Sequence, residues 1–271
     1  MIKKKANVGM IISAAVLIVI IIACLMAPLS PYDPNLVKPL EKFQSPSAAH
    51  WFGTDNFGRD VFTRILYGGR VSLLVGFLSM VVSIIFGTLY GIISGSSGKI
   101  VDGFMMRLAD IFMSVPSFLI IITLNIYLKA GISTLVITIA LFSWMSVARI
   151  VRAETLSLKE REFVLASEGL GAGKFWIITK HYFKNVFSSV LVASTNSIAS
   201  AILTESSLSY LGFGITIPNA SWGGMLDGAQ KYIMTHPSLA VYAGACILIT
   251  VLCFNVLGNS IRQSYDPKSR R

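Results

Sequence analysis

Hydrophobic and polar positions follow one another along this chain in long blocks. A helix that crosses a bilayer needs about 20 predominantly apolar residues, and several of the apolar blocks are close to that length. They cover residues 8–28, 71–93, 102–128, 132–150, 186–203 and 237–257. This pattern predicts an all-α integral membrane protein with six transmembrane helices, located in the cell membrane as a multi-pass protein.

The first apolar block follows three lysines, Lys3, Lys4 and Lys5, and allows two interpretations. A cleaved signal peptide has an apolar core of only about 7–15 residues. The block from 8 to 28 contains no charge over its whole length. We therefore interpret it as a membrane helix in contact with lipid.

Two polar segments are rich in residues that interrupt helices. The segment 28–67 contains five prolines, and Gly53 and Gly58 predict a turn within it, after which Asp60 begins a short helix. The segment 205–230 is interrupted by glycines and Pro218 and reads as a broken or re-entrant stretch. Irregular backbone at membrane depth is tolerated only where protein or a cavity covers it. Pro116 should similarly kink the third predicted span.

The placement of charge predicts the orientation of the chain. Charged residues make up 13% of the sequence and the net charge is +10, which in a soluble protein would suggest nucleic acid as a partner. If the N-terminus is cytoplasmic, 16 of the 23 lysines and arginines fall in cytoplasmic segments. The positive-inside rule favours this orientation, with both termini in the cytoplasm and no role for nucleic acid.

Most of the interior charge lies in the segment 152–184, which reads as two short helices around a glycine turn. Ser157 and Glu160 have the spacing of a capping box. Apolar residues then recur at steps of three and four, first at Phe163, Ala166 and Leu170 and, after the glycines, at Phe175, Ile178 and Tyr182. Such an amphipathic pair suits docking into the groove of a partner. The alternative, at similar weight, is a solvated basic loop that only sets topology.

The fifth predicted span is unusual because it carries many hydroxyl and amide side chains. These groups must face other helices or water. Hydrogen bonds between helices are one explanation, and lining of a translocation path is the other. The residues assigned tentatively to such a path are Asn196, Ser197, Ser200 and Glu205. In the third span, Arg107 and Asp110 stand three residues apart and are expected to pair.

Several chemistries are unsupported by the sequence. Gly173 and Lys174 suggest a phosphate-binding loop, but Glu168 stands at its first glycine and Phe175 at its hydroxyl position. The three histidines occupy different loops, so no metal site and no cofactor are expected. The cysteines, Cys24, Cys246 and Cys253, lie in apolar runs and are not expected to form disulfides. No nucleophile–base pair is visible, and the chain is not expected to be an enzyme.

The run from Phe163 to Ala172 resembles the cytoplasmic loop of ABC-importer permeases that contains the pattern Glu-Ala-Ala, three residues, Gly, nine residues and Ile-x-Leu-Pro. Ala166 and Gly171 match the pattern. The departures are Leu165 for Glu, Ser167 for the second Ala, His181 for Ile, Phe183 for Leu and Lys184 for Pro. The resemblance implies contact with an ATPase through Phe163, Leu165, Ala166, Gly169 and Gly171.

A longer and more specific resemblance lies before the second span. Its residues, Trp51, Gly53, Thr54, Asp55, Gly58, Arg59 and Asp60, are similar to the hallmark of the second permease subunit of the dipeptide/oligopeptide/nickel transport family. The segment from Ser207 to Gly223 and the tail from Phe254 resemble that family too. Arg59, Arg64 and Arg70 lie near Asp55 and Asp60 and could pair with them.

This resemblance implies a type I ABC importer permease fold with three parts. Residues 1–70 would form an N-terminal helix and external loop, 71–262 the permease core with its cytoplasmic coupling loop 152–184, and 263–271 a cytoplasmic tail. The implied partners are a paralogous permease subunit, two cytoplasmic ATPase subunits that hydrolyse ATP, and an external substrate-binding protein.

The implied function is to form half of the translocation path for peptides. Nickel or a metal-chelate complex is the alternative cargo, because an external binding protein usually sets specificity in this family. A secondary transporter that works without ATPases is a weaker alternative, since the sequence offers Glu205 and few other intramembrane ionisable residues.

Overall fold

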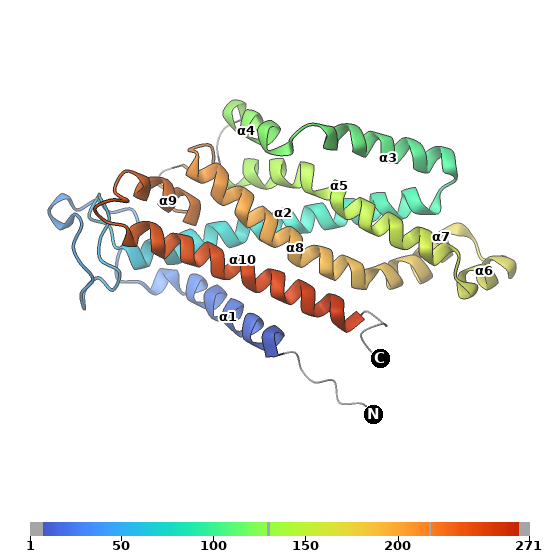
Figure 1. The fold of residues 1–271 in the computed structure, drawn as a ribbon, viewed down its shortest axis with the longest axis horizontal. Helices are drawn as coiled ribbons and strands as arrows, with labels where there is room; N and C mark the ends of the chain where they lie inside the picture. Colours follow the sequence, from blue (N-terminus) through green and yellow to red (C-terminus); the bar gives the residue numbers. More distant parts are fainter. Residues whose placement is uncertain (1–7, 129–130, 217, 266–271) are drawn as a thin grey trace.

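The structure, a computed structural model, describes residues 8–128, 131–216 and 218–265. Within these residues the regular structure is helical, and the one isolated β-bridge joins Thr54 to Asp60. Figure 1 shows the helices as a bundle of long rods with shorter helices at its two ends. In chain order the α-helices are α1 (Val8–Leu25), α2 (Val61–Ser96), α3 (Lys99–Ser114), α4 (Ser117–Tyr127), α5 (Ile132–Lys159), α6 (Glu162–Gly169), α7 (Lys174–Ile177), α8 (Phe183–Tyr210), α9 (Trp222–Gln230) and α10 (Ser238–Tyr265).

The described helices confirm the predicted set of membrane spans. Five of them are long and apolar enough to cross a membrane, and a sixth span results if α3 and α4 are taken together. Between these two helices the axis bends by 73°. The bend falls at Pro116, as expected, because proline has no N–H to continue the helical ladder.

Two helices are longer than the hydropathy pattern indicated. The short helix expected after Asp60 and the second span are a single helix, α2, of 36 residues. α5 likewise continues past the apolar run to Lys159, so that Ser157 lies inside it and the predicted N-cap there was wrong. Arg161 occupies the N-cap position of α6 instead. Polar residues can extend a helix beyond the bilayer, which hydropathy alone does not reveal.

The centre of the bundle is the contact between α2 and α5, which glycines bring close together. A Cβ on Gly87 would lie 2.6 Å from the carbonyl oxygen of Trp144, and one on Gly91 would lie 2.6 Å from that of Ala148. Gly95 meets Thr155 in the same way, at 2.8 Å from its Cβ. Small residues at such spacing let two helix backbones approach closely in a membrane.

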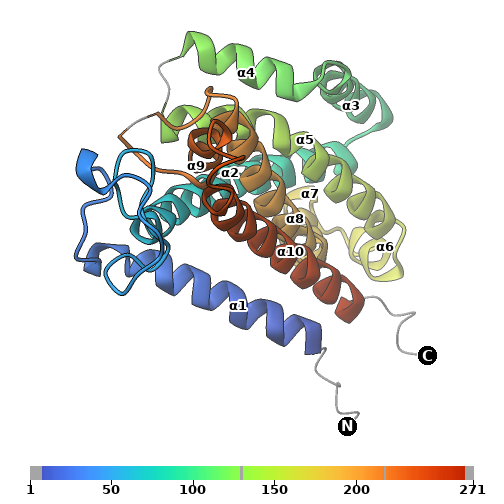
Figure 2. The same ribbon diagram turned by 60° about the vertical axis from the view of Figure 1, so that its left-hand side comes forward.

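α1 and the α3–α4 pair lie on opposite sides of the central helices, as both ribbon views show (Figure 2). α3 is tied to α5 by two ion pairs. Arg152 binds Asp102 through two nitrogen–oxygen contacts of 2.6 Å, and Arg149 binds Asp110 at 2.5 Å. Asp110 thus pairs across helices with a residue 39 positions further on, and the expected pairing with Arg107 was wrong.

The ends of the bundle differ in character. The N-terminal loop (residues 26–60) and α9 lie together at one end, and α6 lies at the other (Figure 1). The first turn of α1 and the last turn of α10 point toward the α6 end in both ribbon views. This arrangement separates two candidate functional surfaces by the length of the bundle.

Candidate functional site

The first candidate surface is the α6–α7 region (residues 160–182). α6 folds back on the following helical segment, because Ser167 Oγ lies 3.0 Å from His181 Nε2 and the rings of Phe163 and Trp176 lie 5.3 and 5.1 Å from that imidazole. Val164, on the inner face of α6, is fully buried and belongs to a core cluster with residues of α2, α5 and α8. The region is therefore a packed unit that continues the bundle and not a free loop.

Gly171 ends α6 in a conformation that favours glycine. Its φ is +84°, and a Cβ at this position would meet no atom within 4 Å. The N–H of Ala172 donates to the carbonyl of Ser167 at 3.0 Å, and that of Gly171 donates to the carbonyl of Glu168 at 2.9 Å. These are the two bonds of a Schellman motif. The left-handed backbone, and not packing, explains the glycine.

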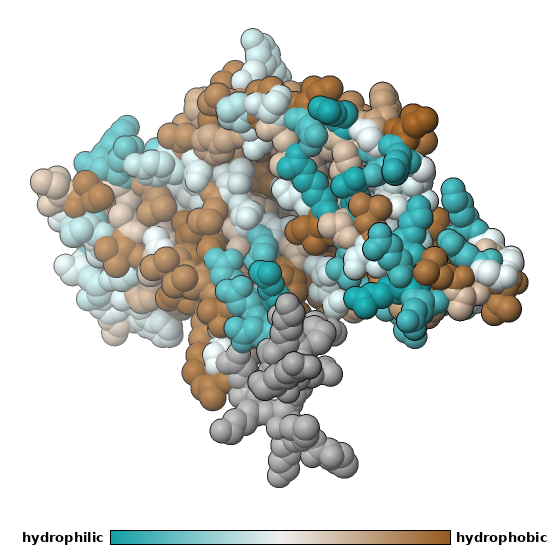
Figure 3. Space-filling model, turned by 45° about the vertical axis from the view of Figure 1, so that its right-hand side comes forward, coloured by the Kyte–Doolittle hydropathy of each residue, from teal (hydrophilic) through white to brown (hydrophobic). Residues whose placement is uncertain are grey.

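The apolar side chains of the α6–α7 region divide between core and surface. Those exposed are Phe163, Leu165, Leu170, Phe175 and Trp176. Tyr182, which the spacing placed on the same face as Phe175, is 3% exposed and belongs to the core. Figure 3 shows hydrophilic residues gathered at this end of the molecule, with hydrophobic ones scattered among them. These five exposed apolar side chains make the α6–α7 region a candidate contact surface.

A hollow with a volume of about 730 Å³ lies beside the start of α6. Three carboxylates line it together with one arginine, an asparagine and two apolar side chains: Glu154, Glu160, Glu162, Arg161, Asn185, Leu158 and Phe163. The sequence pattern has Leu165 where related loops carry a glutamate. The structure nevertheless supplies acidic groups next to the exposed apolar ones, and the sequence comparison missed them because they precede the motif.

The second candidate surface is the N-terminal loop, and the hallmark residues form its interior. The Asp55 carboxylate accepts hydrogen bonds from the backbone N–H of Phe57 and Arg59, at 2.8 and 3.0 Å. Its second oxygen lies 2.8 and 2.7 Å from the Nε and Nη2 of Arg59, and 3.6 Å from Nε of Arg64. Two of the expected arginine pairs are confirmed. For Arg70 the structure shows the guanidinium 5.8 Å from the ring centre of Tyr67.

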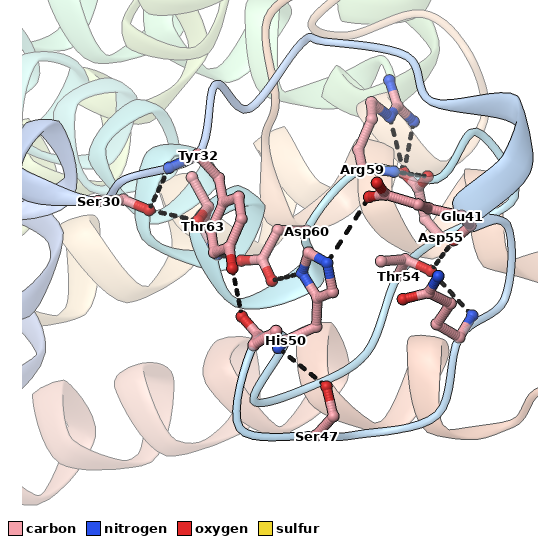
Figure 4. A network of polar contacts seen from close by, with 12 residues as sticks. Ser30, Tyr32, Glu41, Ser47, His50, Thr54, Asp55, Arg59, Asp60 and Thr63 are labelled. Carbon is pink, nitrogen blue, oxygen red and sulfur yellow. Dashed lines mark hydrogen bonds and ion pairs between the residues drawn. The ribbon is translucent and has the colours of Figure 1, made fainter.

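Asp60 joins the N-terminal loop to α2. One carboxylate oxygen accepts the N–H of Thr63 at 2.7 Å and caps the helix, as expected from the sequence. The other lies 2.9 Å from Nδ1 of His50, a buried residue that sequence reasoning did not assign to this group. Figure 4 shows His50 between Asp60 and Glu41, with the ring of Tyr32 beside it, its centre 4.8 Å away and tilted by 36°. Only the folded loop brings these residues together.

The two glycines of the hallmark have positive φ, +74° at both Gly53 and Gly58. A Cβ would lie 2.3 Å from the carbonyl oxygen of Gln44 in the first case and 1.9 Å from that of Lys38 in the second. Trp51, in contrast, is 65% exposed and packs against Phe62. The hallmark therefore builds the loop, and Trp51 is the part of it that a partner could contact.

The polar residues of α8 do not all face the same way. Several hydroxyls bond to the backbone of their own helix, as Ser194 does to the carbonyl of Val190 at 2.8 Å. Asn196 and Ser200 are exposed in this single chain, and Ser197 is half-buried. Glu205 is completely buried, at 0% exposure. It therefore does not share the open face of Asn196 and Ser200.

Comparison with known proteins bears on both surfaces. Residues 87–271 match the family model described as the binding-protein-dependent transport system inner membrane component. The chain is 40% identical over 269 residues to an oligopeptide transport system permease protein of Bacillus subtilis, covering 99% of this chain and 87% of that protein. It is 37% identical to a dipeptide transport system permease protein of Alkalihalophilus pseudofirmus, covering 98% and 87%.

A solved structure shows the same fold. It is that of the MetNI methionine ABC transporter in an inward-facing conformation, and the match covers 74% of this chain and 95% of the other with a TM-score of 0.61. The sequence identity is 16%, so this likeness speaks for the architecture alone.

These findings define the class of protein: a multi-pass inner membrane permease with the type I ABC importer fold. The chain belongs to the family of binding-protein-dependent transport system inner membrane components, and it is the permease subunit of an ABC importer.

Proposed function

We propose that this permease forms one half of a translocation path for peptides. The observation that carries the proposal is the similarity over nearly the whole chain to oligopeptide and dipeptide permease proteins. A glutathione transport system permease protein of Pectobacterium atrosepticum is 34% identical over 97% of this chain, and glutathione is a tripeptide. Nickel or a metal-chelate complex remains the alternative cargo.

The proposed orientation places the α6–α7 region in the cytoplasm, with both termini on the same side. The N-terminal loop and the segment 205–230 then face outward, where a binding protein would deliver substrate. In support, the structure gathers these two segments at one end and α6 at the other. Residues 1–70, 71–262 and 263–271 would serve as entry helix with external loop, core and cytoplasmic tail.

We assign docking of the ATPase to α6. Its exposed residues include Phe163, Leu165 and Ala166, with Gly169 at its C-terminal end and Gly171 just beyond it. The acidic hollow beside α6 adds charge that a basic side chain of the partner could neutralise. ATP hydrolysis takes place in the two partner ATPases, and movement of α6 is transmitted to the bundle because Val164 is buried in the core.

The proposed mechanism is alternating access. Closure of the ATPases would rock this permease against a paralogous one, so that the path opens outward or inward. Asn196, Ser197 and Ser200 would line that path, where their amide and hydroxyl groups suit a peptide backbone. The exposure of Asn196 and Ser200 in the single chain supports this assignment.

The cargo is tested in a strain that lacks this permease. We expect it to lose growth on di- or oligopeptides that supply a required amino acid, and to regain growth with the wild-type gene. Uptake of radioactive nickel, with and without a chelator, is measured in the same strains. Loss of nickel uptake with unchanged use of peptides would overturn the peptide assignment.

Docking of the ATPase is tested with Ala166→Arg, which places a long charged side chain on the exposed face of α6. Gly98→Arg is the matched control, because a side chain there meets no atom within 4 Å and lies at the turn before α3. We expect Ala166→Arg to reduce co-purification of the ATPases and transport, and the control to retain both. Full transport with Ala166→Arg would contradict the role of α6.

The path is tested with Asn196→Cys and a thiol reagent applied to the assembled importer. We expect modification to change when the ATPases are trapped with a non-hydrolysable ATP analogue, because alternating access opens and closes the path. Ala193→Cys on the same helix is the control, since Ala193 is 4% exposed and packed in the core. Equal labelling of Asn196→Cys in both states would argue against its place in the path.

A further inference from the structure

Glu205 occupies a fully buried position where α8, α2 and the segment before α9 meet. Ser72 of α2 donates a hydrogen bond to Oε2 at 2.7 Å, and Ser209, one turn further along α8, donates to Oε1 at 2.7 Å. Ser206 lies 3.4 Å from Oε2. Each carboxylate oxygen therefore holds one close serine hydroxyl. Burying a carboxylate costs free energy unless hydrogen bonds replace those it made with water. The serine hydroxyls provide these hydrogen bonds.

The same two hydroxyls also accept hydrogen bonds from the backbone of the α8–α9 segment (residues 211–216 and 218–221) and its junction with α9. The N–H of Ile215 donates to Ser209 Oγ at 3.1 Å, and the N–H of Trp222 donates to Ser72 Oγ at 3.3 Å. A serine hydroxyl has one proton to donate and two lone pairs that accept. Because Glu205 takes the proton of each serine, the lone pairs of both remain available to the backbone.

Close packing seats the α8–α9 segment on this site. A Cβ on Gly214 would lie 2.1 Å from Ser209 Oγ, and one on Gly223 would lie 2.3 Å from the carbonyl oxygen of Ser206. The indole N–H of Trp222 donates to the carbonyl of Ile65 in α2 at 3.0 Å. The segment is thus bound to two helices, to α8 through Ile215 and Ser209 and to α2 through Trp222 and Ser72.

We propose that Glu205 is a positioning residue that locks the α8–α9 segment to α2 and α8 by orienting the hydroxyls of Ser72 and Ser209. A shift of α8 against α2 changes the distance between these serines and must move the segment or break one of its two bonds. The inference rests on the proposed function, in which this segment faces the binding protein. Glu205 then links arrival of loaded binding protein at the surface to the movement of the spans that open the path.

The local part of the proposal is tested by amide hydrogen exchange on the purified importer. Ser209→Ala should accelerate exchange in peptides that contain Ile215, and Ser72→Ala in those that contain Trp222. Glu205→Gln should accelerate exchange around at least one of them, because the amide nitrogen of glutamine cannot accept a hydrogen bond, so that one serine loses the acceptor that orients its hydroxyl. The expected increase is about 10- to 100-fold, the factor for leaving a buried N–H without its acceptor.

Ser79→Ala is the matched control for these variants. Ser79 lies on α2, is 1% exposed, and has its hydroxyl 3.4 Å from the carbonyl of Val136 in α5, away from Glu205. We expect its exchange pattern around the α8–α9 segment to remain that of the wild type. Unchanged exchange in Glu205→Gln, or equal acceleration in Ser79→Ala, would overturn the positioning role.

The functional part is tested by the ratio of ATPase activity with and without loaded binding protein, measured on the reconstituted importer. We expect Ser72→Ala, Ser209→Ala and Glu205→Gln to lower this ratio by about tenfold, and Ser79→Ala to keep it. If Glu205→Gln does not assemble, the two serine variants decide the question. A wild-type importer without stimulation by any binding protein would refute the proposed function, whereas stimulated wild type with equally stimulated variants would refute only the role of Glu205.

Discussion

Substitution of Asp55 by alanine should unfold the N-terminal loop while leaving the membrane helices intact. Its carboxylate accepts two backbone N–H groups and pairs with Arg59, and the side chains of Asp55 and Arg59 are only 12% and 10% exposed. Removing one partner of a buried ion pair costs about 3–5 kcal/mol, because the other charge is left without compensation. Arg64, 3.6 Å from the same carboxylate, would lose a partner as well. A free energy of this size corresponds to at least about a 100-fold change in a local opening equilibrium.

Amide hydrogen exchange over residues 30–60 of the solubilised protein measures that equilibrium. The control is Asp33→Ala, which removes an exposed aspartate of the same loop whose carboxylate accepts one bond, from the N–H of Asn35 at 2.8 Å. We expect at least about 100-fold faster exchange for Asp55→Ala, and a change below tenfold for Asp33→Ala, since an exposed local bond contributes about 1 kcal/mol. Wild-type exchange in Asp55→Ala would show that the buried ion pair does not hold the loop.

Three further substitutions probe the bundle and its α6 end. Gly91→Leu should destabilise the α2–α5 contact by about 1–3 kcal/mol or more through overpacking, and the protein should therefore melt at a lower temperature in detergent. The control Gly103→Leu should melt like the wild type, because a Cβ at that position meets no atom within 4 Å. Gly171→Ala should destabilise the end of α6 by about 1 kcal/mol, because residue 171 has a φ of +84°. Gly169→Ala should be tolerated, so that proteolysis of α6 should be faster in the first variant than in the second. Asp110→Ala should change the stability by less than about 1 kcal/mol, because its ion pair is half exposed. A large loss of stability there would show that the pair is buried in the assembled importer.

Much of the architecture was accessible from local pattern. The apolar runs predicted the spans, and Pro116 predicted the bend of the third one. Asp60 was correctly expected to begin a helix. These features depend on the hydrophobicity of about 20 consecutive residues, on the missing N–H of proline or on the capping carboxylate of an aspartate, all of which are properties of the residues themselves.

The errors have a common origin in contacts between distant residues. The pattern paired Asp110 with a neighbour three positions away, whereas the fold gives it Arg149 of another helix. It placed a helix start at Ser157, whereas α5 continues to Lys159. It placed Tyr182 on the docking face, whereas packing against the core buries it. In each case a local spacing rule was outweighed by the packing of helices that the spacing cannot describe.

The sequence by itself determined the class of this protein, because hydrophobic length, charge asymmetry and the hallmark before the second span are all written along the chain. Only the tertiary structure decided what individual polar residues do. Glu205 looked like a path residue in a polar helix, but the approach of Ser72, which is 133 positions away in the chain, encloses it. Burying this carboxyl group requires hydrogen-bond donors from both α2 and α8. These donors meet only when the helices pack together, so no single segment of the sequence reveals them.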